Sequence, residues 1–416
     1  MKLLVLSNGH GEDEIAIRII EKLQHDFAKL ELAALPIVGR GYAYQKLQIP
    51  LVGRVRQMPS GGFIYMGGNP LWQDLRGGLI QLTIEQLQLV RRWGQNGGTI
   101  LAVGDIVPLF YAWYSRANYA FVGTAKSEYY LRDEAGWLEQ TSWLERKFGS
   151  VYLPWERWLM SRDRCQAVFP RDSLTTKVLQ QWGIPACDLG NPMMDGICVE
   201  IQPQESGKLN ILLLPGSRMP EALRNWHEIL IAVESTSKAV SETKVDFLAA
   251  IAPALELQPF TELALSLGWK VVGGESHAVI LKRNGRTLSL SGERYGQFLQ
   301  QANLAIAMAG TATEQFVGLG KPAVIFPGEG PQFTFAFAEA QSRLLGRSIV
   351  MVESPEAVGK AIAKLVNDPQ LLDRIAFNGR KRMGEAGAAE RIARYLQKTL
   401  LSSENDRRKI TTITTD

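Results

Sequence analysis

The sequence is poor in cysteine and has almost no excess of one charge, and both shortages exclude classes of protein. Its three cysteines, Cys165, Cys187 and Cys198, show neither CxxC spacing nor a nearby pair of histidines. This argues against a zinc site and a disulfide framework, and fits a reducing cytosol. The 46 basic and 42 acidic residues leave a net charge of only +4. That excess is too small for a nucleic-acid-binding surface, but it suits a phosphate-bearing ligand or an anionic membrane surface.

Long apolar segments are also missing. No run of about 18 uncharged apolar residues occurs, so we expect no transmembrane helix. The chain begins with the strand-like residues 2–6, in place of the basic region, apolar stretch and cleavage site of a signal peptide. We therefore predict a cytoplasmic protein whose contact with a membrane is peripheral, at its inner face.

The sequence does contain a regular alternation of short apolar runs and amphipathic helical patterns. In the first half the runs cover residues 3–6, 30–35 and 99–103, with a helical pattern over 15–23. In the second half they cover residues 210–214, 245–252, 269–272, 304–307, 323–326 and 349–352. Such alternation predicts an α/β fold with parallel sheets covered by helices on both faces. The chain is long enough for two such doubly wound, Rossmann-like domains.

Turn and linker residues indicate where these domains meet. Gly190-Asn191-Pro192 and the polar stretch 202–208 are typical of a connection between domains. The predicted organisation is an N-terminal domain over 1–190, a linker over 191–208 and a C-terminal domain over 209–385. We expect a helix over 386–401 to pack back on the N-terminal domain, and a disordered tail over 402–416.

Tryptophan is concentrated in the first half of the chain. Seven of the ten tryptophans precede residue 160: Trp72, Trp93, Trp113, Trp137, Trp143, Trp155 and Trp158. Ordinary core packing is one explanation. A surface for a lipid or amphipathic acceptor is the other, because basic residues accompany several of them, as Arg157 does between Trp155 and Trp158. For residues 127–158 the sequence leaves both explanations open.

A phosphate-binding turn is predicted at the segment 307–315. It follows a strand and opens a helix with Gly310, Thr311, Ala312, Thr313 and Glu314. Small residues let a ligand approach the backbone, and the free N–H groups and partial positive charge of a helix start attract phosphate. The alternative is an ordinary turn in which Thr311 caps the helix and Glu314 closes a capping box.

A second candidate segment lies at the end of the strand over 210–214. Gly216 and Ser217 form a turn there, and Arg218 would project a fixed cation toward a ligand at the carboxyl end of the sheet. The alternative role for Arg218 is a surface salt bridge with Glu221, which would contribute less than about 1 kcal/mol.

The first strand is followed by a glycine-rich turn, Ser7 to Asp13. It lacks the third glycine of a GxGxxG dinucleotide motif, so Gly9, Gly11 and Glu12 are assigned to the acceptor side of a cleft. His10 is a candidate general base, a donor ligand or a plain turn residue.

Asp105 follows the apolar strand over 99–103. Apolar neighbours would raise its pKa and fit it to accept a proton from a sugar hydroxyl. Its alternative role is that of a helix N-cap.

These segments, in this order, resemble lipid-A-disaccharide synthase and its relatives, which are glycosyltransferases of the GT-B type with two Rossmann-like domains facing a cleft. The matching pieces are residues 213–218 with Glu221, 189–195 and 310–314, and together they cover most of residues 165–385. Residues 7–13 and Asp105 match more loosely, and residues 328–341 look like the signature of a divergent subgroup. Asn8, His10 and Glu12 depart from the family's first turn, and residues 127–158 have no counterpart, so the acceptor is expected to differ from a lipid A precursor.

The resemblance implies an inverting glycosyltransferase that uses a UDP-sugar donor, a lipid or glycolipid acceptor, and neither metal nor cofactor. Arg218 would contact the diphosphate, Glu314 the ribose and Gln332 the donor sugar. The sequence has no convincing acidic DxD pair, and helix starts with Arg218 can replace a cation in holding the leaving diphosphate.

Two other functions stay open at this point. A UDP-sugar 2-epimerase would share the architecture, but it needs several acid-base groups around one sugar carbon, and the sequence offers few beyond Asp105, His10 and Glu12. A noncatalytic nucleotide-sugar binder is the third possibility. The sequence identifies neither the sugar, nor the acceptor, nor the oligomeric state.

Overall fold

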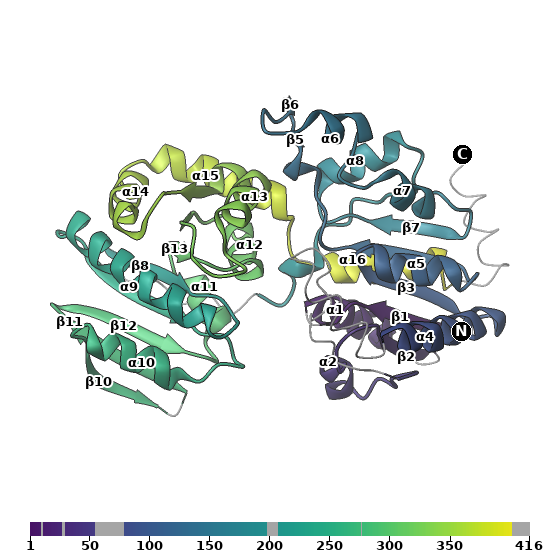
Figure 1. Cartoon of the computed structure of the whole chain (residues 1–416), viewed down its shortest axis with the longest axis horizontal. Helices are drawn as coiled ribbons and strands as arrows, with labels where there is room; N and C mark the ends of the chain where they lie inside the picture. The colour runs from purple at the N-terminus through teal and green to yellow at the C-terminus, as the bar shows by residue number, and fades with distance from the viewer. Residues whose placement is uncertain (10, 27–29, 55–78, 198–206, 276, 402–416) are drawn as a thin grey trace. The chain divides into compact units, whose positions relative to one another are not determined.

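The computed structural model describes residues 1–9, 11–26, 30–54, 79–197, 207–275 and 277–401. The chain forms two compact units (Figure 1): Met1–Asp195 together with Glu385–Asp416, and Gly196–Gly384. Four features named from the sequence lie outside the described residues: His10, Trp72, Cys198 and the tail over 402–416.

The sheet of the first unit has five parallel strands in the order β2-β1-β3-β4-β7. The strands are β1 (Lys2–Ser7), β2 (Glu31–Pro36), β3 (Thr99–Gly104), β4 (Tyr119–Gly123) and β7 (Cys165–Phe169). The chain adds β2 on one side of β1, and adds β3, β4 and β7 on the other side. The direction of winding therefore reverses between β1 and β3, and ligands of open α/β sheets collect at the carboxyl ends of strands at such a reversal.

Each face of this sheet has its own apolar core, because successive side chains of a strand point to opposite faces. Leu3 and Val5 pack with α1 and α16, whereas Leu4 and Leu6 pack with α4, α5, α7 and α8. These helices are α1 (Gly11–Asp26), α4 (Leu79–Gln95), α5 (Ile106–Tyr114), α7 (Pro154–Met160), α8 (Ser173–Gln181) and α16 (Ala388–Thr399). A short α2 (Tyr42–Lys46) contributes the buried Tyr44. The C-terminal helix α16 thus belongs to the core of the first unit.

Asp195 binds the start of α16 at the place where the chain leaves the first unit. Its carboxylate accepts hydrogen bonds from the backbone N–H groups of Gly387 and Ala388, and from that of Ala389 at 2.6 Å. A carboxylate at a helix N-terminus satisfies N–H groups that have no partner within the helix. The residues at which the chain leaves the first unit and returns to it are therefore joined by hydrogen bonds at the start of α16.

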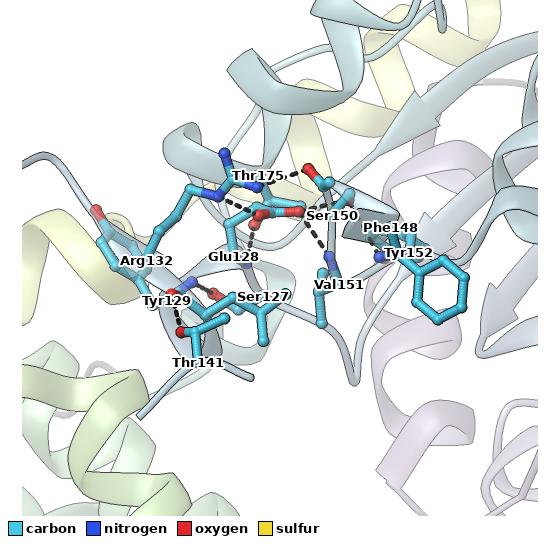
Figure 2. Close-up of polar contacts among 12 residues, drawn as sticks. Ser127, Glu128, Tyr129, Arg132, Thr141, Phe148, Ser150, Val151, Tyr152 and Thr175 are labelled. Carbon is cyan, nitrogen blue, oxygen red and sulfur yellow. Dashed lines mark hydrogen bonds and ion pairs between the residues drawn. The ribbon is translucent and has the colours of Figure 1, made fainter. Parts of the chain in front are cut away.

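Between β4 and β7 the first unit contains a small region held together around Glu128. Its elements are η1 (Glu128–Tyr130), β5 (Arg132–Asp133), β6 (Gly136–Trp137) and α6 (Trp143–Phe148). Figure 2 shows the Glu128 carboxylate accepting hydrogen bonds from Ser150 Oγ at 2.5 Å and Val151 N at 2.9 Å. Its second oxygen lies 2.8 Å from Arg132 Nε. Burial raises the pKa of Glu128, and these partners compensate for removing the carboxylate from water.

The aromatic residues of the segment 127–158 divide between core and surface. Tyr129 and Tyr152 are buried, whereas Trp143, Trp155 and Trp158 are exposed. Arg157, which lies between Trp155 and Trp158 in the sequence, does not accompany them at the surface. Arg157 is buried, and its guanidinium lies 3.7 Å from the ring centre of Trp182.

The second unit contains an eight-stranded sheet in the order β10-β11-β12-β9-β8-β13-β14-β15. The strands are β8 (Lys208–Leu214), β9 (Lys244–Ala250), β10 (Lys270–Glu275), β11 (Ala278–Arg283), β12 (Arg286–Ser291), β13 (Leu304–Ala307), β14 (Ala323–Ile325) and β15 (Ile349–Met351). Its helices are α9 (Glu221–Ala239), α10 (Leu257–Ser266), α11 (Tyr295–Gln301), α12 (Thr311–Gly318), α13 (Phe335–Leu345), α14 (Val358–Val366) and α15 (Pro369–Met383). The strands from β12 to β15 are parallel, and winding reverses between β8 and β13.

The predicted fold class is confirmed: both units are doubly wound α/β structures. The run over 269–272 was expected to be one more strand of the parallel alternation, and this is wrong. It enters β10, an exposed antiparallel strand at the sheet edge. The strands β4, β7, β11 and β12 were not predicted. In the described part of the chain, no helix has the length and apolar character needed to span a membrane.

Candidate functional site

In the first unit, the carboxyl ends of β1 and β3 are joined by a hydrogen bond between side chains. Asn8 follows β1, Asp105 follows β3, and Asn8 Nδ2 donates to Asp105 Oδ1 at 2.7 Å. This bond lies where the winding of the sheet reverses. The two turns that the sequence analysis selected, after β1 and after β3, therefore lie side by side in the structure.

Asp105 is the N-cap of α5. The same Oδ1 atom accepts from the backbone N–H of Val107 at 2.9 Å. Burial raises the pKa of Asp105, while the hydrogen bonds from Val107 and Asn8 and the charge of Lys126 oppose that rise. The capping role expected as an alternative is confirmed. Both of these hydrogen bonds use Oδ1, so capping does not use Oδ2.

Glu12 in the first turn of α1 is the second carboxylate at this position. Thr124 Oγ1 donates to Glu12 Oε1 at 3.5 Å. A Cβ atom on Gly104 would lie 3.4 Å from Glu12 Cγ, so this glycine lets Glu12 lie against the end of β3. Burial, helped by the charges of Asp105 and Asp13, raises the pKa of Glu12 to about 7. A carboxyl group that titrates near neutral pH is suited to general acid–base work.

Asp13, the next residue, has a structural role. It accepts a hydrogen bond from Ser7 Oγ at 2.5 Å, and Ser7 Oγ also lies 2.6 Å from the hydroxyl of Tyr44. Burial raises the pKa of Asp13 to about 6. This buried chain fixes the start of α1 against the end of β1, and thereby orients Glu12.

The two glycines assigned to the acceptor side differ. A Cβ atom on Gly9, whose φ is 91°, would lie 2.2 Å from the carbonyl oxygen of Val38, so packing requires this glycine. Gly11 is exposed, and no heavy atom lies within 4 Å of where its Cβ would be. The close packing of Gly9 is a structural requirement, whereas Gly11 leaves space beside Glu12.

A cation acts on Asp105. Lys126, in the loop after β4, forms an ion pair of 2.5 Å with the buried Glu156 and is the positive charge that opposes the rise in the Asp105 pKa. The sequence analysis missed Asn8, Thr124 and Lys126 as members of this cluster. Their position immediately after β1 or β4 is the one signal that could have identified them, because parallel strands end at one edge.

In the second unit, the turn after β8 approaches the turn after β13. Gly216 has φ 103°, and a Cβ atom there would lie 3.3 Å from the carbonyl oxygen of Met308. Asn225 Nδ2 donates to the carbonyl of Pro215 at 3.0 Å and fixes the turn from the side of α9. Ser217 and Arg218 remain exposed beyond it.

Arg218 lies beside Gln332, the residue assigned to the donor sugar. With the amide oxygen of Gln332 turned toward Arg218, that oxygen accepts from Nη1 at 2.6 Å and from Nε at 3.3 Å. Two candidates separated by more than a hundred residues are therefore neighbours. The guanidinium is held at the carboxyl end of β8, at the reversal of winding.

Glu221 holds the loop that carries Gln332. It is buried, and its Oε1 accepts from the backbone N–H groups of Gln332 at 3.0 Å and Phe333 at 2.8 Å. A Cβ atom on Gly330 would lie 2.2 Å from Oε1, so only glycine fits against this carboxylate. The alternative expected from the sequence was a surface salt bridge between Arg218 and Glu221; the Glu221 carboxylate is buried and is enclosed by this loop.

Helix α12 begins at Thr311, with Gly310 as an N-cap that makes no side-chain hydrogen bond. The capping box expected from Thr311 and Glu314 is therefore wrong. The first N–H groups of the helix lack intrahelical partners, as in any helix. Gln341 Nε2 donates to the carbonyls of Ala309 at 3.1 Å and Gly310 at 3.2 Å, which ties this turn to α13.

The other residues of this turn are placed differently. Thr311 is exposed and Ala312 and Glu314 are half-buried, so all three are accessible at the helix start. Thr313 is buried, and its Oγ1 donates to the carbonyl of Ala309 at 2.6 Å, so its side chain supports the turn from inside. The sequence analysis missed Asn225 and Gln341, which lie within helices and carry no local motif.

Among the described residues, no group of three or more His, Cys, Asp or Glu side chains is arranged to hold a metal ion. At this site Asp13 accepts a hydrogen bond from Ser7, Asp105 accepts from Asn8 and a backbone N–H, and Glu156 pairs with Lys126.

No protein-family model matches the chain, and no curated protein is significantly similar to it in sequence. Similar solved structures do exist. MurG of Acinetobacter baumannii is 14% identical, with 96% of this chain and 99% of that chain covered and a TM-score of 0.55. MnaA of S. aureus, solved with UDP, is 12% identical, with 95% and 96% covered and a TM-score of 0.56. A UDP-GlcNAc 2-epimerase from Neisseria meningitidis, solved with UDP-GlcNAc, is 14% identical, with 97% and 100% covered and a TM-score of 0.55.

These likenesses extend over nearly the whole chain, and the fold is of the GT-B type with two Rossmann-like domains. At such low identity they establish the architecture alone. The finer resemblance to lipid-A-disaccharide synthase stays a prediction from sequence motifs.

The raised pKa of Glu12 predicts a pH-dependent effect of Glu12→Gln on stability. The folded pKa of about 7 exceeds the ordinary 4.5, so the stability that comes from protonated Glu12 is complete below pH 4.5 and is lost as pH rises through 7. Glutamine cannot ionise. The free energy of unfolding of the Glu12→Gln variant minus that of the unmodified protein should therefore rise between pH 5 and 8, by up to about 3 kcal/mol.

Urea unfolding at the two pH values measures this difference. Glu21→Gln, at an exposed position later in the same helix, is the matched control and should show no such trend. A Glu12→Gln difference that stays constant with pH would show that Glu12 ionises normally.

Proposed function

We propose that this protein is an inverting glycosyltransferase that moves a sugar from a UDP-sugar to a lipid or glycolipid acceptor at a membrane surface. The observation that carries the proposal is a division of chemistry between the two winding reversals. One holds an exposed guanidinium and a glycine-led helix start, and the other holds two carboxylates, Glu12 and Asp105. A donor phosphate suits the first and an acceptor hydroxyl suits the second.

The donor side is supported by the chemistry of phosphate binding. Arg218 offers a cation, Gly216 and Ser217 offer an approachable backbone, and the start of α12 offers N–H groups with partial positive charge. Glu314 and Gln332 would contact the ribose and the sugar. Among proteins of similar fold, S. aureus MnaA was solved with UDP and the Neisseria enzyme with UDP-GlcNAc, which supports the choice of donor.

The transfer step needs a base and a stabilised leaving group. The acceptor oxygen would form a bond to the anomeric carbon as the bond from that carbon to the diphosphate breaks, and UDP would leave with the electron pair. Arg218 and the helix start would stabilise its negative charge without a metal. The proton of the acceptor hydroxyl would pass to the carboxylate pair, where Glu12 and Asp105 are candidates on geometry.

Epimerisation of a UDP-sugar is the second candidate. The structures of MnaA and the Neisseria epimerase match this fold as well as MurG does, and two carboxylates could exchange a proton at one carbon. The transferase is favoured because α5, which starts at Asp105, carries exposed aromatic side chains that suit a lipid acceptor and have no use in isomerising a soluble nucleotide-sugar.

Radiolabelled UDP-sugars incubated with the protein and total membrane lipid separate these functions. We expect label in the lipid fraction with release of UDP. Label in an isomerised free UDP-sugar would establish the epimerase, and retention of unchanged UDP-sugar on the protein would establish a noncatalytic binder.

Arg218→Ala should weaken binding of UDP by about 1.5 to 3 kcal/mol, the range for hydrogen bonds to a charged group. Calorimetric titration with UDP measures the loss. Arg224→Ala removes a comparably exposed arginine from α9 and should leave the affinity unchanged. Equal affinities for the two variants would remove Arg218 from the site.

Asp105→Asn and Glu12→Gln should each lower kcat by roughly two to four powers of ten while UDP affinity is retained. Asparagine caps a helix as well as aspartate does, so Asp105→Asn should also keep its melting temperature, and a role in capping alone predicts no loss of rate. Glu21→Gln is again the control.

The pH dependence of kcat/KM assigns the proton between the two carboxylates. If Glu12 accepts it, the rate rises through pH 7, because the base must be ionised and its pKa is about 7. In Asp105→Asn this rise should move to lower pH, because the Asp105 charge raises the Glu12 pKa. A rise that is unchanged in Glu12→Gln would assign the proton elsewhere.

A further inference from the structure

The first unit has an exposed aromatic surface formed by α5 and α7. Phe110 is 39% exposed, Tyr114 40%, Trp155 53% and Trp158 46%. Trp113 connects two of them: its ring centroid lies 5.7 Å from that of Phe110 and 5.4 Å from that of Trp158. Tyr114 stacks on Phe110 at 6.3 Å, and Trp155 lies one helical turn before Trp158 on α7. Single exposed apolar residues are ordinary, but a connected group of large aromatics on one surface indicates a contact with another body.

Helix α5 shows that packing among the described residues of the unit does not account for this surface. Its sequence, IVPLFYAWY, has no charged residue. Pro108, Leu109, Tyr111 and Ala112 are buried. A helix at the surface of a water-soluble domain normally has a polar outer face, whereas the outer face of α5 presents Phe110 and Tyr114.

The same helix connects this surface to the carboxylates. α5 begins at its N-cap Asp105, and a helix rises about 1.5 Å per residue. Phe110 and Tyr114 therefore follow Asp105 by roughly 8 and 14 Å along the helix axis. At its start, α7 carries Glu156, which is paired with Lys126 beside Asp105. The aromatic surface thus extends away from the site at which an acceptor hydroxyl would be deprotonated.

Basic residues follow both helices of the aromatic surface in the chain. Arg162 lies 4.5 Å over the ring of Trp158, Arg116 is exposed just after α5, and Arg164 is half-buried before β7. Asp163 is the acidic residue among them. Tryptophan and tyrosine with arginine favour the boundary between water and acyl chains, and the excess positive charge favours anionic headgroups.

We propose that the α5–α7 aromatic surface, defined by Phe110, Trp113, Tyr114, Trp155 and Trp158, docks on an anionic lipid bilayer. The docking presents a membrane-borne acceptor to the carboxylate pair, and in that respect it rests on the proposed function. Trp143 and Leu144 are also exposed, but they lie on a different helix, α6, where Trp143 contacts Lys147. They provide a matched control.

Co-sedimentation with vesicles tests the surface directly. The full chain should bind vesicles of phosphatidylcholine containing about one third phosphatidylglycerol, bind phosphatidylcholine vesicles weakly, and lose binding in high salt. The double variant Trp155→Ser with Trp158→Ser should bind the anionic vesicles at least roughly tenfold more weakly. Trp143→Ser should bind as the unmodified protein does.

Calorimetric binding of UDP and the melting temperature are measured on every variant. If the double variant unfolds, Trp155→Ser alone, which removes no described ring contact, replaces it. Unchanged vesicle binding in the α7 variants, or an equal loss in Trp143→Ser, overturns the proposal. The proposal is also overturned if the unmodified protein sediments as a dimer and the α7 variants sediment as monomers, because the surface would then bind a second copy of the chain.

The two proposals fail in different ways. Vesicle binding that depends on Trp155 and Trp158, without sugar transfer to any lipid, leaves the surface assigned and removes the transferase. Transfer to lipid that is equally fast in the double variant and the unmodified protein removes the surface and leaves the transferase.

Discussion

The hydrogen bond from Asn8 to Asp105 is the constraint on which the first unit's site depends. It joins β1 and β3 where the winding reverses, and the carboxylate oxygen that accepts it also caps α5. The position of Asp105 therefore determines where α5 begins and which negative charge faces Glu12. Gly104 completes the arrangement: its φ of 135° favours glycine, and Glu12 Cγ lies within van der Waals contact of the place where a Cβ would be. A capping contact and a titrating carboxylate are in this way parts of one local structure.

In the second unit a buried carboxylate, that of Glu221, holds the candidate site together. Glu221 lies near the turn proposed to bind phosphate, where a free negative charge would repel the ligand. Its oxygens instead accept backbone N–H groups of Gln332 and Phe333, so its charge stabilises the loop over 328–333. That loop places Gln332 against Arg218. The main effect of removing Glu221 would therefore be to displace Gln332 from Arg218, and the change in local charge would be secondary.

Features that a short stretch of chain determines were predictable from sequence, and features that depend on distant partners were not. Turns after strands were predicted at Asp105, Gly216 and Gly310, and the structure has these residues after β3, β8 and β13. Their roles in binding and catalysis stay predictions. The contact of Asn8 with Asp105 spans 97 residues, and that of Gln341 with Gly310 spans 31, with no local motif. Periodicity records that a segment is apolar, not what covers it, so the run over 269–272 was misplaced and the aromatic segment 127–158 stayed ambiguous.

The composition of α5 follows from serving two environments at once. Its inner side chains pack on the sheet, and the backbone N–H of Val107 at its start donates to the Asp105 carboxylate, the candidate base of the proposed transfer. If water alone covered its outer side, polar residues there would cost the fold nothing, because no core contact needs Phe110 or Tyr114. Their presence beside Trp113, Trp155 and Trp158 is explained when the outer side meets acyl chains. The orientation of α5 would then align a lipid-borne hydroxyl with Asp105, so that binding at the bilayer and proton transfer share one rigid element.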